Sequence, residues 1–162
     1  MKVARKGGQR AAVTQLVKAM DGAEGRVGWF ESAKYADGKP VAGIAYVQEF
    51  GSAARSIPPR SYFRTTAEGN RNQWAKDVEA MSRAAARGKF DPNNIMEGIC
   101  LAAEGQVRAT ITKLWSPELH KKTVAARVRR MASGRPPKMG IKKPLVDSGL
   151  LLATLTSQVT KK

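Results

Sequence analysis

The most regular pattern in this chain is a stripe of mostly apolar residues between positions 91 and 114, spaced as on one face of a helix. Asp91 followed by Pro92 is a typical helix start, because the carboxylate can cap free backbone N–H groups and proline suits the first turn. The stripe consists of Ile95, Ile99, Ala102, Ala103, Val107, Thr110, Ile111 and Leu114. The sequence therefore predicts a long helix over this range.

Two more helices follow from the same periodicity. One covers residues 65–87 and ends at Gly88, and the other covers residues 9–20 and ends at Gly22 and Gly25. The apolar face of the longer helix is formed by Trp74, Val78, Met81 and Ala85. That of the shorter helix is formed by Ala12, Leu16 and Ala19, with Val13, Val17 and Met20 beside them.

Strand signals occur towards both ends of the chain. Valine and aromatic residues predict a strand over residues 27–33, and Asp37-Gly38 then supplies a tight turn, since glycine tolerates a positive φ. Near the C-terminus, Asp147-Ser148 can cap a short helix over residues 150–152. The alternation that follows predicts a second strand over residues 155–160.

Residues 41–50 satisfy neither the helical nor the strand period cleanly. Pro40 suits a first helical turn and Gly51 suits a left-handed cap, so we favour a short helix over a second hairpin strand. The pair Pro58-Pro59 fixes φ at two positions and removes two backbone donors. We therefore expect residues 51–60 to form a stiff, extended arm rather than part of a sheet.

These elements predict an α+β fold: a small twisted sheet, antiparallel or mixed, packed by two long helices and carrying the extended arm. The chain has 162 residues, of which 42% are hydrophobic, and a chain of this size can bury one modest core. We therefore expect residues 1–162 to form a single domain.

The chain is strongly basic, with 29 Lys and Arg against 13 Asp and Glu and a formal charge of +16. Residues 116–143 lose the helical pattern and contain one acidic residue, Glu118, so they read as a long basic loop, functional or disordered, although Val124 to Met131 can form a helical turn or more. Contact with DNA phosphates and contact with acidic protein partners remain open alternatives. The candidate contact residues are Lys121, Lys122, Arg127, Arg129, Arg130, Arg135, Lys138, Lys142 and Lys143.

Nothing in the sequence indicates catalysis. His120, the only histidine, makes neither a metal-ligand spacing nor a nucleophile and base pair with Glu118 and Cys100, and no glycine-rich phosphate-binding motif is present. We expect no enzyme activity, no catalytic residue, no metal and no cofactor. Cys100 is expected to be a small buried side chain. The basic N-terminus lacks the apolar run of a signal peptide and no segment is long enough to span a membrane, so we expect a soluble protein made in the cytoplasm.

Large side chains around the predicted strand and arm are candidates for contacts between subunits. Trp29 and Phe30 would lie on opposite faces of a strand, and only one of those faces meets the core unless a helix covers the other. Tyr62 and Phe63 follow the arm and can anchor it in their own subunit or in a neighbour. The candidate interface residues are Trp29, Phe30, Ile57, Pro58, Pro59, Arg60, Tyr62 and Phe63.

Five short segments occur in an order that is similar to that of a known family. They are Val27-Gly28-Trp29-Phe30, the run from Tyr35 to Ala42, Glu49-Phe50-Gly51, Ile57-Pro58-Pro59-Arg60 with an aromatic residue and Arg64 after it, and Leu145-Val146-Asp147-Ser148-Gly149-Leu150. In this succession the chain resembles the small tail-completion, or neck, proteins that join head and tail in tailed bacteriophages. In that family, proline and phenylalanine usually follow the arginine directly, whereas this chain has Ser61-Tyr62-Phe63.

The resemblance implies a structural virion protein at the head-tail joint. It implies a small α+β domain that assembles as a ring, expected to be a hexamer, to close the tail tube. The implied partners are the tail tube or tail terminator, the head connector, and the double-stranded DNA that passes through the lumen, with no membrane involved. The alternative, based on charge alone, is an accessory protein that binds nucleic acid without sequence preference.

Overall fold

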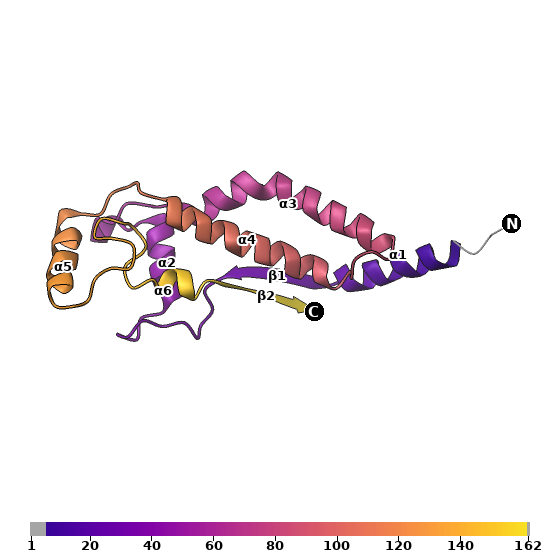
Figure 1. Ribbon diagram of the computed structural model, residues 1–162, viewed down its shortest axis with the longest axis horizontal. Coiled ribbons are helices and arrows are strands. Elements are labelled where there is room, and N and C mark those ends of the chain that lie inside the picture. Colours follow the sequence, from indigo (N-terminus) through magenta and orange to yellow (C-terminus); the bar gives the residue numbers. More distant parts are fainter. Residues whose placement is uncertain (1–5, 162) are drawn as a thin grey trace. The chain divides into compact units, whose positions relative to one another are not determined.

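A computed structural model describes residues 6–161, so the first five residues of the basic N-terminus lie outside the described residues. The described chain contains six α-helices and a two-stranded antiparallel sheet, which confirms the α+β class. The elements are α1 (Lys6–Met20), β1 (Ala23–Gly28), α2 (Val41–Phe50), α3 (Tyr62–Ala86), α4 (Asn94–Lys113), α5 (Lys121–Ala132), α6 (Leu150–Ala153) and β2 (Thr156–Lys161), as drawn in Figure 1. A single 3-10 turn, Ala53–Arg55, lies between α2 and α3.

The tertiary contacts group into two compact units, each made of segments that are separated in the sequence. The first unit comprises residues 1–27, 67–104 and 157–162, and the second comprises residues 28–66 and 105–156. The division falls inside both long helices and at the ends of both strands. The single domain expected over the whole chain stays a prediction.

In the first unit, α4 packs against both strands of the sheet. Ser157 of β2 donates a hydrogen bond to Glu104 Oε2 at 2.9 Å. Gly25 of β1 faces Cys100, and the Cys100 sulfur occupies the space that a Cβ on residue 25 would need. Cys100 is buried, as predicted, and burial raises the pKa of its thiol. Close approach of strand and helix therefore requires glycine at position 25.

The core of the second unit is built around Tyr62, the first residue of α3. Its side chain is fully buried, and its hydroxyl donates a hydrogen bond to Ala45 O of α2 at 2.9 Å. The Trp29 ring packs edge-on against it, with centroids 6.0 Å apart. The other buried apolar residues of this unit are Val41, Ala45, Val107, Ile111, Pro144, Val146, Leu151 and Leu155.

The predicted helices in the first two thirds of the chain are confirmed. The predicted apolar faces agree in part: Ala19 of α1, Ala85 of α3 and Val107 of α4 are buried, whereas Val13 and Val17 of α1 are exposed. One boundary differs: α3 begins at Tyr62 rather than near residue 65. The buried Glu49 carboxylate of α2 accepts hydrogen bonds from the N–H groups of Phe63 at 2.8 Å and Arg64 at 3.1 Å. These are first-turn donors that would otherwise lack a partner, so a distant residue extends the helix.

The first predicted strand is displaced. β1 covers Ala23–Gly28 rather than residues 27–33, so Trp29 and Phe30 do not lie on opposite faces of a strand. The reason is tertiary: the Trp29 indole N–H donates a hydrogen bond to Leu151 O at 2.8 Å, which takes the chain away from the sheet. The turn at Asp37-Gly38 is confirmed, with Gly38 at φ 80°.

The C-terminal elements agree with the prediction in kind. β2 runs from Thr156 to Lys161, and the short helix before it, α6, follows Gly149 as its N-cap residue. Asp147-Ser148 was expected to be the cap. Ser148 contributes only a long hydrogen bond, in which its hydroxyl accepts from the Leu150 N–H at 3.3 Å.

The segment between α2 and α3 is not an extended arm. Ser52 and Ile57 form an antiparallel bridge, exchanging two backbone hydrogen bonds of 2.8 and 2.9 Å across the turn at Ala53–Arg55. The segment folds back on itself because its backbone groups pair with one another. Pro58 and Pro59 follow this pairing and do not prevent it.

The basic segment, expected to be a long loop, contains the twelve-residue helix α5, so the helical turn allowed over Val124 to Met131 is confirmed and is longer than expected. His120 precedes the helix, and its side chain accepts a hydrogen bond from the Lys122 N–H at 3.2 Å. The periodicity indicated only a turn or more of this helix because Lys and Arg occupy five of its twelve positions and its buried residue is Arg127 rather than an apolar one.

We expect Gly51→Ala to lower the free energy of unfolding by about 2 to 3 kcal/mol. Gly51 has φ 77°, and a Cβ there would lie 2.8 Å from both Ile57 O and Pro59 N, so backbone would have to move. Gly43→Ala in the middle of α2 is the control: it has room, and it should raise stability by about 0.5 to 1 kcal/mol. Denaturant melts measure both, and equal effects would contradict this account of Gly51.

Candidate functional site

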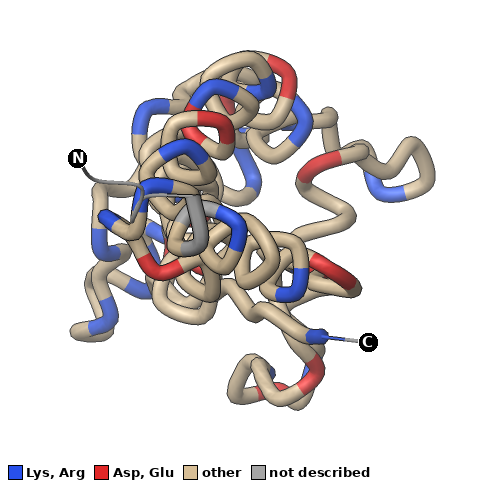
Figure 2. The backbone as a smooth tube through the Cα atoms, turned by 90° about the vertical axis from the view of Figure 1, so that its right-hand side faces the viewer, with Lys and Arg blue, Asp and Glu red and all other residues tan. Residues whose placement is uncertain are grey.

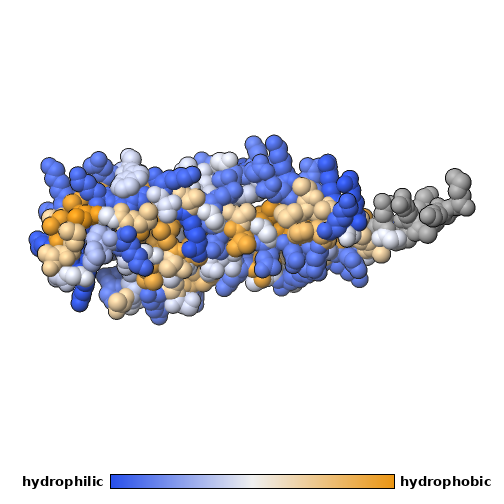
Figure 3. All heavy atoms as spheres, in the orientation of Figure 1, coloured by the Kyte–Doolittle hydropathy of each residue, from blue (hydrophilic) through white to orange (hydrophobic). Residues whose placement is uncertain are grey.

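An aromatic cluster is exposed on α2. Tyr46 is 64% exposed and Phe50 is 48% exposed, and their ring centroids lie 4.7 Å apart. The Arg64 guanidinium of α3 lies 4.6 Å from the centroid of the Phe50 ring. Tyr46, Phe50 and Arg64 are called the aromatic cluster below. Figure 3 shows that hydrophobic side chains reach the surface among hydrophilic ones on the face drawn.

The sequence contained a signal for this cluster that the periodicity analysis did not use. Val41 and Ala45 form the buried face of α2, while Tyr46 and Phe50, four residues apart, form a second apolar face that is exposed. A helix that is apolar on more than one side is typical of helices that other protein surfaces cover on more than one side. This double pattern is why residues 41–50 fitted no single period.

The predicted interface residues are mostly occupied within the second unit. Tyr62 and Arg60 are buried, and Trp29 and Phe63 are half-buried with their rings packed at a centroid distance of 6.4 Å. Phe30, Ile57 and Pro58 are half-buried as well, and Pro59 is exposed. Arg60 and Tyr62 are held by hydrogen bonds within this unit.

The nine predicted basic contacts divide into two groups. Arg130 is exposed but forms an ion pair with Asp147 at 2.5 Å, and Arg127 and Lys143 are buried. The remaining six are exposed: Lys121, Lys122, Arg129, Arg135, Lys138 and Lys142. Lys and Arg are spread along the backbone in Figure 2 and outnumber Asp and Glu, so the positive charge is not confined to this segment.

Arg127 and Lys143 are buried and hold the second unit together, so neither is an exposed cation of the kind expected for a DNA contact. Arg127 Nη1 donates hydrogen bonds to Ile141 O at 3.1 Å and Lys143 O at 2.7 Å. Lys143 Nζ donates to Leu114 O and lies 4.5 Å from the centroid of the Trp115 ring. Burial lowers the pKa of both side chains. They tie the segment after α5 to the helix and to the end of α4.

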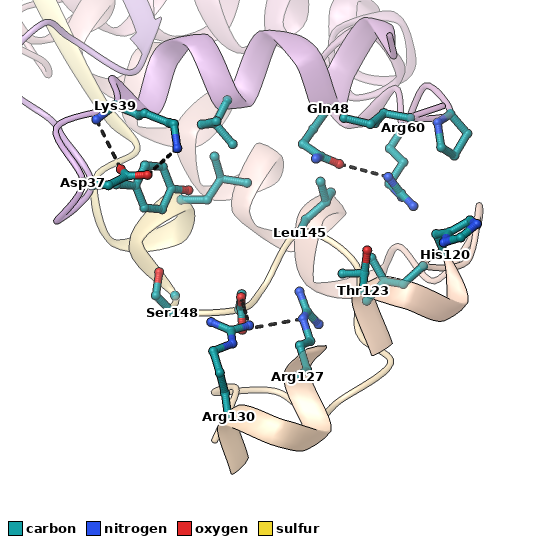
Figure 4. Close-up of a pocket in the computed structure, with 18 of the residues that line it drawn as sticks. Asp37, Lys39, Gln48, Arg60, His120, Thr123, Arg127, Arg130, Leu145 and Ser148 are labelled. Atoms are coloured by element: carbon teal, nitrogen blue, oxygen red, sulfur yellow. Dashed lines mark hydrogen bonds and ion pairs between the residues drawn. The ribbon is translucent and has the colours of Figure 1, made fainter. Parts of the chain in front are cut away.

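A cavity of 440 Å³ in the second unit is lined by residues from α2, α5 and α6 and from the segments on both sides of α2 and α5. Figure 4 shows Arg60 entering it from one side and Arg127 and Arg130 entering from α5. The charged residues of the lining are Asp37, Lys39, Arg60, Arg127, Arg130 and Asp147, that is, four cations against two carboxylates. We call this the basic cavity.

The charges in the basic cavity are unevenly paired. Asp37 forms an ion pair with Lys39 at 2.5 Å. Asp147 is the ion-pair partner of both Arg130 and Arg127, but Arg127 Nε lies 3.5 Å from the Asp147 carboxylate and forms no hydrogen bond. Arg60 has three hydrogen bonds, all to neutral acceptors: Gln48 Oε1, Pro117 O and Glu118 O, each at 2.9 Å.

No carboxylate of residues 6–161 forms an ion pair with Arg60, although its side chain is buried. Burial lowers the Arg60 pKa, and the nearby Arg127 charge lowers it further. The Asp147 carboxylate opposes the effect of burial on the pKa of Arg127. The cavity therefore holds two buried guanidinium groups, and their combined charge is only partly compensated.

Residues 6–161 contain no cluster of His, Cys, Asp and Glu side chains that is arranged to bind a metal ion. No helix in that range is long and apolar enough to cross a membrane. Comparison with models of protein families, with curated proteins and with solved structures found no match to this chain. The relation to phage tail-completion proteins thus stays a prediction from the sequence segments.

Proposed function

We propose that this protein is a tail-completion protein at the head-tail joint of a tailed bacteriophage virion. Support comes from the five sequence segments and from an α+β fold in which those segments are structural. Trp29, Glu49 and Arg60 of the segments each make a side-chain hydrogen bond that holds the second unit together. A shared order of such residues is expected when a fold is shared.

The proposed assembly is a homo-oligomeric ring, with a hexamer as the expected form because it matches the symmetry of a tail tube. Six chains at +16 each would carry a formal charge of about +96, which suits a channel through which double-stranded DNA passes. The exposed basic residues around α5 are the proposed DNA contacts. The tail tube or tail terminator and the head connector are the proposed protein partners.

The observation that carries this proposal is the exposed aromatic cluster on α2. Aromatic and arginine side chains dominate binding energy at protein interfaces, and a pair of contacting aromatic rings left open to water is costly in a free monomer. We assign it to the contact between neighbouring subunits, in place of Tyr62 and Arg60, which are buried.

We expect Tyr46→Ala combined with Phe50→Ala to weaken ring assembly by at least tenfold, since truncating central interface aromatics costs about 2 kcal/mol or more. Folding should be retained, because both rings are exposed. Native mass spectrometry of the purified protein and electron microscopy of tails measure the assembly. Leu101→Ala is the matched control, since Leu101 of α4 is 63% exposed but lies outside the cluster.

Two outcomes would contradict the proposal. One is a monomer at all concentrations that is absent from purified phage particles. The other is a double variant that assembles as well as Leu101→Ala. A monomer that binds DNA tightly without sequence preference, with an affinity that falls steeply with salt, would favour the nucleic-acid-binding accessory protein instead.

A further inference from the structure

The positive charge of the basic cavity is only partly balanced by carboxylates of its own chain. Arg60 and Arg127 are 4% exposed, and no carboxylate of the described residues pairs with Arg60. Arg127 Nε is buried and has no hydrogen-bond partner. A buried guanidinium is normally matched by an anion, so the cavity is built for one that comes from outside.

The chemistry of the lining also indicates which kind of group carries the anion that would bind there. The uncharged part of the lining includes the apolar residues Ile44, Ile57, Leu145 and Leu151. A carboxylate on a short side chain, followed by an apolar residue, would satisfy both kinds of surface. A guanidinium also binds a carboxylate in a planar, two-point geometry, which suits Asp or Glu.

Duplex DNA fits this cavity less well. Its phosphates lie along a stiff rod and suit exposed cations, such as Lys121 and Arg129, better than guanidinium groups inside a recess. An extended peptide can place one side chain in a recess while its backbone stays outside. At 440 Å³ the cavity falls in the size range of pockets that hold small ligands or single side-chain groups.

We infer that the basic cavity is a docking site for an Asp or Glu side chain on an extended segment of a partner protein. The carboxylate lies between Arg60 and Arg127, and an apolar neighbour contacts Leu145 or Leu151. This inference deepens the proposed function, because a joint protein holds neighbouring virion proteins. Its test, however, uses only the isolated chain and peptides.

The sharpest variant is Gln48→Glu. Gln48 Oε1 already accepts a hydrogen bond from Arg60 Nη1 at 2.9 Å, so the change replaces an amide with a carboxylate of the same shape. The chain would then supply the missing counter-charge itself, and the fold is not at risk, because a pairing is gained. Gln15→Glu is the matched control: it adds the same charge on an exposed position of α1 that does not line this cavity.

The probe is a capped pentapeptide with one Glu between two Leu residues, compared with the same peptide carrying Gln. Binding is followed by NMR signals of the Arg60 and Arg127 side-chain N–H groups at about 0.15 M salt, where general surface attraction is screened. We expect the Glu peptide to shift both signals and the Gln peptide to leave them unchanged. Gln48→Glu should weaken binding about tenfold or more, and Gln15→Glu by less than about twofold.

Several results would overturn the inference. Equal binding of the Glu and Gln peptides would show that the cavity does not recognise a carboxylate. Equal weakening by Gln48→Glu and Gln15→Glu would show that binding depends only on the overall charge of the protein. Inorganic phosphate or a short DNA duplex that shifts the two signals, when the Glu peptide does not, would assign the cavity to another ligand. If the chain binds the Glu peptide but never forms rings, the docking site is supported and only the proposed function is refuted.

Discussion

Arg127→Ala should lower the free energy of unfolding by about 3 to 5 kcal/mol, although the residue lies on a basic, mostly exposed helix. The Arg127 guanidinium is buried and donates hydrogen bonds to Ile141 O and Lys143 O. Its removal leaves two carbonyl oxygens, one of them buried, without these donors and takes one of its two cations from Asp147. The segment from 141 to 147 would lose its attachment to α5.

The control for this prediction is Arg129→Ala, two positions further along α5. It removes the same charge from the same helix, but Arg129 is exposed, so its effect on stability should be below about 0.5 kcal/mol. Urea denaturation of the two variants and the parent protein provides the measurement. If both variants were equally stable, Arg127 would be a solvated side chain and the basic cavity would lose one wall.

The Tyr62→Ala variant should be destabilised by a similar amount, about 3 to 5 kcal/mol. Tyr62 is fully buried, and the change removes a large ring from the centre of the second unit together with its edge contact to Trp29. The hydrogen bond from its hydroxyl to Ala45 O is a smaller part of the loss, so Tyr62→Phe should cost about 1 kcal/mol.

Tyr46→Ala supplies the comparison within the same unit. Tyr46 is 64% exposed and contacts the Phe50 ring, so its truncation should cost less than about 1 kcal/mol in the monomer. Thermal melts of the three tyrosine variants give the order Tyr62→Ala, Tyr62→Phe, Tyr46→Ala from the least to the most stable. A reversed order of the two alanine variants would mean that the buried and exposed faces of the second unit are misassigned.

The two tyrosines also separate folding from assembly. Tyr62 was a candidate for contacts between subunits, yet its burial makes it a core residue, and its variants should lose the fold and every binding activity together. Tyr46 was not a candidate, and its variants should keep the fold and lose assembly only. Variants of the exposed α2 residues can therefore test assembly without unfolding the protein, whereas variants of buried residues such as Tyr62 cannot.

Local sequence information was sufficient for most of the helices. The stripe from Ile95 to Ile111 sets the buried face of α4 because side chains three and four residues apart share a helix face. Gly51 ends α2, as predicted, because it can adopt a positive φ that other residues resist. These features depend on neighbours within one or two turns, so the chain itself encodes them.

The basic cavity, in contrast, was invisible in the sequence. Its guanidinium groups come from positions 60, 127 and 130, and its carboxylates from positions 37 and 147. The segments around these positions meet only when the second unit folds, so no spacing along the chain marks them. The same reason hid the burial of Lys143, which a count of charges places among the exposed cations.

By itself, the sequence determined the α+β class, the long helices and the strong positive charge of this protein, because periodicity, glycine and proline positions and composition are local properties. Only the tertiary structure decided where β1 ends, where α3 begins and which cations are buried. Each of these depends on a side chain that reaches a distant backbone group: Trp29 to Leu151, Glu49 to Phe63, and Arg127 to Lys143. Such pairings are chosen by packing, since a buried donor or acceptor must find a partner wherever the fold supplies one.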